Sequence, residues 1–184
     1  MDRLSRRGAI GLGFMSGPAS MAALAGAGDA AGPAAPEVSI AVPLYNDERA
    51  IAIGPGRRFH VVLANRSERP LRLWSDRCSD GEDNLRFELF EGRGVEVVRR
   101  SPRDWDKNFP MAVTLETGDQ DVREVSFDPG EWGLPWPQSE IGTRRVRMRA
   151  VYEIRATQAA GEKGVWVGKV ASRYADYTVR DYRR

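Results

Sequence analysis

Residues 145–154 read RVRMRAVYEI, and this stretch decides the fold class. Charged and apolar side chains alternate along it, and Val151 is the one interruption. The apolar positions are Val146, Met148, Ala150, Tyr152 and Ile154. The charged positions are Arg145, Arg147, Arg149 and Glu153. Successive side chains of a strand point to opposite faces, so the pattern predicts a strand with one buried and one solvated face, as in antiparallel sheets.

Shorter segments with the same alternation precede and follow this strand. They are residues 38–44, 59–63, 85–89, 95–98, 111–115, 122–127, 165–170 and 177–179. Glu91 to Gly94 (EGRG) predicts a hairpin turn, and residues 158–164 predict a second turn. No segment after residue 27 shows sustained helical periodicity. The chain is therefore predicted to be all-β, an antiparallel β-sandwich of about eight or nine strands.

The N-terminal segment, residues 1–27, has the layout of an export signal. Three arginines precede the uncharged stretch 9–25, and Ala25-Gly26-Ala27 supplies small residues for cleavage. Ser5 to Ile10 (SRRGAI) resembles the twin-arginine export signal. An ordinary secretory signal and an uncleaved anchor are the alternatives. The weak hydrophobicity of the stretch argues against a stable membrane span.

The remaining organisation follows from this signal. Residues 28–36 (GDAAGPAAP) predict a flexible tether, and residues 37–184 predict one folded domain. The predicted location is therefore periplasmic or extracellular.

Removal of the signal changes the charge balance. The chain has 28 Lys and Arg against 26 Asp and Glu. Residues 1–27 hold three arginines and one aspartate, so 25 residues of each sign remain and the formal net charge is zero. Nucleic-acid-binding proteins carry a basic surface, so this balance argues against a nucleic-acid partner.

The chain contains one cysteine, Cys78, and one histidine, His60. Catalysis by a Cys–His pair would need these two side chains within hydrogen-bond reach of each other. His60 lies within a predicted strand, whereas Cys78 lies among carboxylates that disfavour the thiolate. The same two residues are too few ligands for zinc or copper. We therefore predict that the protein is not an enzyme and that it needs no cofactor.

The stretch around Cys78, WSDRCSDGEDN at residues 74–84, is rich in carboxylates. Calcium takes oxygen ligands from loops, so these side chains form a candidate calcium site. The candidate ligands are Asp76, Asp80, Glu82 and Asp83. The alternative interpretation is a solvated polar turn, in which Arg77 offsets part of the negative charge.

Two irregular stretches, residues 101–110 and 128–142, carry three tryptophans. Trp105 lies in the first stretch, and Trp132 and Trp136 lie in the second. Exposed indole faces would make a ligand-binding platform for a sugar ring or a peptide. The alternative is that each tryptophan packs against one end of the sandwich.

The arginines Arg145, Arg147 and Arg149 share one face of the longest strand, about 7 Å apart. They are candidates for contact with an anionic partner. The alternative is a solvated face whose arginines pair with carboxylates on neighbouring strands.

Three segments resemble a known family. Phe59 to Ser67 (FHVVLANRS), Leu115 to Asp119 (LETGD) and Val146 to Tyr152 resemble the strands and turns of secreted bacterial immunoglobulin-like domains. Their order along the chain is also similar to that of BsuPI-type proteinase inhibitors. This resemblance implies an immunoglobulin-like sandwich, but a fold alone does not supply a function.

The function predicted from these observations is an exported, non-enzymatic binding or accessory domain that acts on proteins or cell-envelope components. A protein or an envelope glycan would be the partner, and the oligomeric state is left open. Three alternatives predict other ligands: a carbohydrate-binding module using the loop tryptophans, a proteinase inhibitor, and a calcium-dependent adhesion-type domain.

Overall fold

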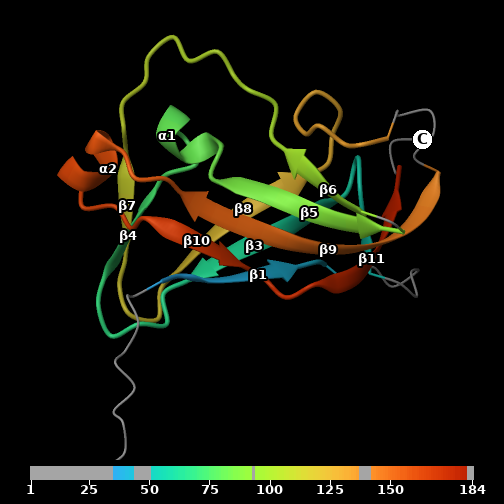
Figure 1. Ribbon diagram of the computed structural model, residues 1–184, viewed down its shortest axis with the longest axis horizontal. Helices are drawn as coiled ribbons and strands as arrows, with labels where there is room; N and C mark the ends of the chain where they lie inside the picture. Colours follow the sequence, from blue (N-terminus) through green and yellow to red (C-terminus); the bar gives the residue numbers. More distant parts are fainter. Residues whose placement is uncertain (1–34, 44–50, 93, 137–141, 182–184) are drawn as a thin grey trace, which may run out of the picture. The chain divides into compact units, whose positions relative to one another are not determined.

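The computed structural model describes residues 35–43, 51–92, 94–136 and 142–181 (Figure 1). All of them belong to one unit, residues 33–184. The predicted export signal, residues 1–27, and most of the predicted tether lie outside the described residues. The fold below is therefore that of the predicted C-terminal domain.

Eleven strands and two single-turn helices make up the described part of the chain. The first strands are β1 (Glu37–Ala41), β2 (Ala52–Ile53), β3 (Arg58–Ala64), β4 (Leu71–Trp74), β5 (Leu85–Glu91) and β6 (Gly94–Arg99). The later strands are β7 (Ala112–Leu115), β8 (Gln120–Ser126), β9 (Thr143–Ile154), β10 (Gly168–Ala171) and β11 (Ala175–Arg180). The helices are α1 (Ser79–Glu82) and α2 (Gln158–Glu162).

The strands form a sandwich. One layer contains the sheet β1–β3–β8, and the other contains β2–β11–β9–β5–β6 with β10 beside β9. Strands β4 and β7 form a separate two-stranded sheet. In the chain, β4 comes directly after β3, and β7 comes directly before β8. Strands β3 and β8 cross behind β5 and β9 in Figure 1. These layers confirm the predicted all-β sandwich.

Two details of the sheets differ from the prediction. There are eleven strands, partly because β2 has two residues and is too short to show alternation. Strand β2 also pairs with β11 in parallel, whereas every other strand pair that the structure describes is antiparallel. The predicted hairpin turn is confirmed, because β5 and β6 pair up to Glu91 and Gly94. Between these two residues, Gly92 has a φ of 65°, a value that favours glycine.

The stretch 74–84, considered as a polar turn, contains the one-turn helix α1, and the predicted turn 158–164 contains the one-turn helix α2. Four or five residues are too few for an apolar stripe, so no helical periodicity could reveal them. The side chain of Thr157 caps α2 by accepting a hydrogen bond from Ala160 N at 3.1 Å. Helix α1 begins after the buried Cys78, whose thiol donates to Ser75 O at 3.3 Å.

The core lies between the two layers, and its centre is aromatic. Phe59 of β3 and Phe87 of β5 meet edge to face, with ring centroids 5.6 Å apart. Phe127 lies 5.1 Å from both rings, and Trp132 lies 5.2 Å from Phe87. Edge-to-face contacts are favourable beyond the apolar area that they bury. Trp132 is only 6% exposed, so this tryptophan is a core residue that joins the loop 127–136 to both layers.

A guanidinium group is also buried between the layers. Arg123 of β8 points inward and is 4% exposed. Its Nε donates to Asp121 at 3.0 Å, and its Nη2 donates to Trp74 O at 2.9 Å. The guanidinium carbon lies 5.0 Å from the centroid of the Tyr152 ring on β9. A buried charge is tolerated when it is paired and hydrogen-bonded, and here these contacts link the two layers.

A substitution at Gly81 tests how closely α1 packs against the end of β4. A Cβ atom at this position would lie 1.8 Å from Ser75 O and 3.2 Å from Trp74 Cβ. We expect Gly81→Ala to lower the free energy of unfolding by about 1–3 kcal/mol or more, because the backbone must shift. Gly161→Ala in α2 is the matched control, since its Cβ would meet nothing within 4 Å. Urea denaturation should show the control unchanged or about 0.5–1 kcal/mol more stable.

Ionisation of the buried Tyr152 phenol makes the free energy of unfolding vary with pH in the alkaline range. Burial raises the pKa of its phenol from 10.0 to about 12. Because the pKa is higher in the folded state than in the unfolded state, the neutral phenol adds to the free energy of unfolding below pH 10. This contribution, at most about 3 kcal/mol, is lost as the pH rises toward about 12. We therefore expect wild-type stability to fall more steeply than that of Tyr152→Phe when urea unfolding is measured between pH 9 and pH 12. Parallel pH profiles would contradict this assignment.

Candidate ligand-binding groove

The predicted calcium ligands are not gathered around one point. Glu82 is buried at 6% exposure, whereas Asp76 and Asp83 are exposed. Asp80 accepts a hydrogen bond from Asn108 Nδ2 at 3.3 Å. No group of three or more His, Cys, Asp or Glu able to hold a metal occurs among the described residues. Asp76 precedes α1 and Asp83 follows it, whereas Asp80 and Glu82 lie within its single turn, where side chains two positions apart point in different directions.

Glu82 instead holds the loop 101–111, which arches over α1 in Figure 1. Trp105 Nε1 donates to Glu82 Oε2 at 2.7 Å, and Arg103 Nε lies 3.0 Å from Glu82 Oε1. Asn108 accepts a hydrogen bond from Ser79 N at 3.1 Å. Trp105 is half-buried, and its polar edge is used to fix this loop. The structure therefore supports the packing interpretation for this residue.

The three loop tryptophans do not form one platform. Trp132 is buried in the core, Trp105 contacts Glu82 before β5, and Trp136 contacts Glu91 at the far end of β5. A strand of seven residues separates these two ends, which corresponds to about 20 Å. The three side chains lie in three different parts of the fold, and ligand binding by any one of them stays a prediction.

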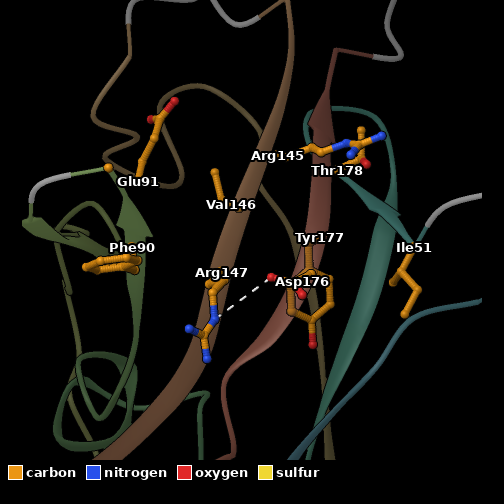
Figure 2. A pocket seen from close by; sticks show the side chains of 10 residues that line it. Ile51, Phe90, Glu91, Arg145, Val146, Arg147, Asp176, Tyr177 and Thr178 are labelled. Carbon is orange, nitrogen blue, oxygen red and sulfur yellow. Dashed lines mark ion pairs between the residues drawn. The ribbon is translucent and has the colours of Figure 1, made fainter.

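A groove does occur on the outer face of the larger sheet (Figure 2). Its volume is about 550 Å³. Its lining residues come from the start of β2 and from β5, β9 and β11: Ile51, Phe90, Glu91, Gly92, Arg145, Val146, Arg147, Asp176, Tyr177 and Thr178. Figure 2 shows Phe90 and Ile51 on opposite sides of β9 and β11. Both side chains are large, apolar and more than two-fifths exposed, at 41% and 43%.

Register explains why these residues meet. Phe90 and Asp176 are both partners of Arg147, so the three form one row across β5, β9 and β11. Arg145 pairs with Thr178 in the row beyond. All five residues take the outward phase of their strands, opposite to the buried Val146. The groove is therefore a direct consequence of the alternation in residues 145–154.

The arginines differ in how strongly they are held. Arg149 is tightly paired: its Nη2 lies 2.6 Å from Glu88 Oε2, and its guanidinium carbon lies 4.6 Å from the Tyr174 ring centroid. Burial opposes ionisation of Glu88, but the Arg149 guanidinium outweighs it and holds the pKa of that carboxyl below its usual range. This pair confirms the predicted pairing with a carboxylate on the neighbouring strand.

The two arginines in the groove are looser. Arg147 lies 3.9 Å from Asp176, and both side chains are largely exposed, so water and salt screen this ion pair. Arg145 is exposed and makes no side-chain hydrogen bond or ion pair with another described residue. An unpaired guanidinium beside exposed apolar groups can bind a carboxylate without first breaking a protein contact.

Trp136 lies beside the groove and orients one of its lining residues. Its Nε1 donates to Glu91 Oε2 at 2.9 Å, and Arg144 donates to Glu91 Oε1 at 3.2 Å. The Arg144 guanidinium carbon also lies 5.3 Å from the Trp136 ring centroid. Of the three predicted tryptophans, Trp136 is therefore the one that the structure brings to the groove, through Glu91.

The two residues considered for nucleophilic chemistry have other environments. His60 pairs across strands with Ala41 and Glu124 and is half-buried. Cys78 is 2% exposed, and its thiol faces the backbone carbonyls of Ser75 and Met111. Neither residue lines the groove.

Comparison of the chain with protein-family models, with curated proteins and with solved structures finds no match. The fold and the groove define a β-sandwich domain with a concave outer sheet face. Among the described residues, no helix is both long enough and apolar enough to cross a membrane. The resemblances to BsuPI-type inhibitors and to twin-arginine signals stay predictions.

Glu82 provides a test of the loop anchor. We expect Glu82→Ala to release Trp105, to leave Arg103 with only its ion pair to Glu131 Oε1 at 3.1 Å, and to destabilise the region by about 1–3 kcal/mol. Trypsin should then cleave after Arg103 or Lys107 faster than in the wild type, as measured by mass spectrometry. The matched control is Asp83→Ala, because the side chain of Asp83 is exposed and makes no hydrogen bond or ion pair with another described residue. Equal cleavage rates in both variants would contradict the anchor.

Proposed function

We propose that the protein is an exported, non-enzymatic binding domain of the immunoglobulin-like type that acts in the periplasm or outside the cell. The observation that carries this proposal is the outer-face groove, in which the exposed Phe90 and Ile51 flank the arginines of β9. Export rests on the sequence of residues 1–27, and the absence of catalysis rests on the residue inventory. The groove supports the binding part of the proposal.

The groove fits a protein ligand better than a purely polar one. Large exposed apolar side chains on both sides of the groove favour partners that bury them, because removal of apolar area from water is favourable. Arg145 and Arg147 add donors for carboxylates, which fix the position and orientation of the ligand. A polypeptide segment that presents both apolar and acidic side chains satisfies both requirements at once.

The flat sheet beneath the groove also suits an extended segment. Its floor is formed where β9 and β11 run side by side, and its walls lie on strands to either side. A bound segment of about four or five residues would span the groove at the usual rise per strand residue. Such a ligand would bind and dissociate readily, because the groove is open to solvent along the sheet face (Figure 2).

Crosslinking in cell-envelope extract tests the groove directly. The full chain would carry a photoreactive residue in place of Thr178, and captured partners would be compared between wild type, Phe90→Ala and Arg145→Glu. We expect each groove variant to reduce capture of the specific partner about tenfold, which corresponds to about 1.4 kcal/mol. The loss in Arg145→Glu should shrink at high salt, whereas that in Phe90→Ala should persist.

Matched controls lie on other surfaces of the domain. Val122→Ala removes an exposed apolar side chain from β8, and Arg69→Glu reverses an exposed arginine outside the groove. Both should capture the partner at the wild-type level. If the groove variants and these controls capture it equally well, the groove is not the binding surface.

A further inference from the structure

A second cavity lies at the opposite end of β5 from the groove, beside α1. Its volume is about 350 Å³, and its lining is predominantly polar. Six charged side chains line it: Arg86, Arg99, Arg155, Glu153, Asp80 and Asp83. A volume near the lower end of the range for ligand sites favours a small ligand or the end of a chain.

The basic side of this cavity holds two arginines in direct register. Arg86 of β5 faces Arg99 of β6 across the strands. Like charges directly opposite each other destabilise a sheet unless anions compensate for them. One anion does so, because Arg86 Nη1 lies 2.7 Å from Glu153 Oε2. The hydrogen bond and charge of Arg86 hold the pKa of Glu153 below its usual range, aided by Lys169 and Arg155.

This compensation is incomplete. Arg86 is 9% exposed, so its guanidinium is largely removed from water, yet Glu153 is its single side-chain partner among the described residues. Arg99 and Arg155 are exposed, and their guanidinium groups make no hydrogen bond or ion pair in the part of the chain that the structure describes. Most of the donors on three guanidinium groups therefore remain available to a further anion.

The other side of the cavity is acidic. Asp80 lies in α1, and its Oδ2 is held by Asn108 Nδ2 at 3.3 Å and by the Ser79 hydroxyl at 3.4 Å. Asp83 follows α1 and is exposed. Its carboxylate has no hydrogen bond or ion pair with any described residue, so it is available to a cationic group. The cavity is thus lined by basic side chains from β5, β6 and the residue after β9, and by acidic side chains from α1, the residue after α1, and β9.

We propose that this cavity binds a small zwitterionic ligand, a free amino acid or a short peptide, whose carboxylate contacts Arg99 and Arg155 and whose ammonium group contacts Asp83. A simple anion such as phosphate would leave Asp83 without a partner and would be repelled by it. A metal cation would likewise be repelled by the three guanidinium groups. A ligand that carries both charges is matched by both sides.

This site is separate from the groove in the proposed function. No residue lines both cavities, and the two lie at opposite ends of β5. The inference therefore stands even if the groove binds no protein.

Calorimetry on the full chain with four probes tests the assignment of each charge. The probes are alanyl-alanine, its N-acetyl derivative, its C-terminal amide, and inorganic phosphate. We expect alanyl-alanine to bind, with each blocked derivative about tenfold weaker because one ion pair is lost. Arg99→Gln should weaken alanyl-alanine about tenfold without further weakening the amide. Asp83→Asn should weaken alanyl-alanine about tenfold without further weakening the acetylated form.

Both variants alter exposed side chains, so melting temperatures at the wild-type value would confirm that they fold. Arg145→Gln, which lies in the groove, is the matched control and should bind every probe like the wild type. The proposal is overturned if alanyl-alanine does not bind or if phosphate binds as tightly. It also fails if Arg99→Gln and Asp83→Asn weaken all probes equally, since neither residue would then recognise one particular charge.

Discussion

The register of β9 is the constraint on which the rest of the structure depends. Side chains of a strand alternate between two faces, so a slip of one residue would bury Arg145 and Arg147 and expose Val146 to water. Burying unpaired guanidinium groups costs far more than any rearranged contact could return. The correct register places the aromatic core on one side and the outward-facing groove residues on the other. The core and the groove are thereby set by the same pairing of β9 with β5 and β11.

Local alternation made the sandwich predictable, and its limits explain what was missed. The burial of alternate residues in 145–154 follows the predicted pattern because one hydrophobic period covers the whole strand. The two-residue strand β2 and the one-turn helices α1 and α2 carry no period that a sequence can reveal. Trp132 looked like a loop residue because its neighbours are glycine and proline. Its ring is nevertheless held in the core by contacts with Phe87 and Phe127.

The groove residues were harder to predict, because the groove joins segments distant in the sequence. Ile51 and Phe90 lie on opposite sides of β9 and β11, and Ile51 reaches the groove only through the parallel pairing of β2 with β11, which leaves no local signal. One signal was present: Phe90 occupies the charged phase of LRFELFE, where Arg86 and Glu88 precede it. A large apolar residue at a position where the strand's other outward side chains are charged indicates an exposed apolar surface. The acidic stretch 76–83 carries the stronger local signal, yet its buried member, Glu82, fixes the loop 101–111 through Trp105 and Arg103.

Neutral composition also concealed a strongly asymmetric surface. By strand alternation, seven basic residues lie on the outer face of the larger sheet: Arg86, Arg99, Arg145, Arg147, Arg149, Lys169 and Arg180. Three acidic residues share that face: Glu88, Glu153 and Asp176. This excess attracts anionic groups at short range, although a neutral domain exerts little pull beyond a Debye length. Glu153 pairs with Arg86 near one end of this face and Glu88 pairs with Arg149, whereas Arg99 and Arg145 make no ion pair with another described residue, so an anion bound on this face would depend on local pairing with these two arginines.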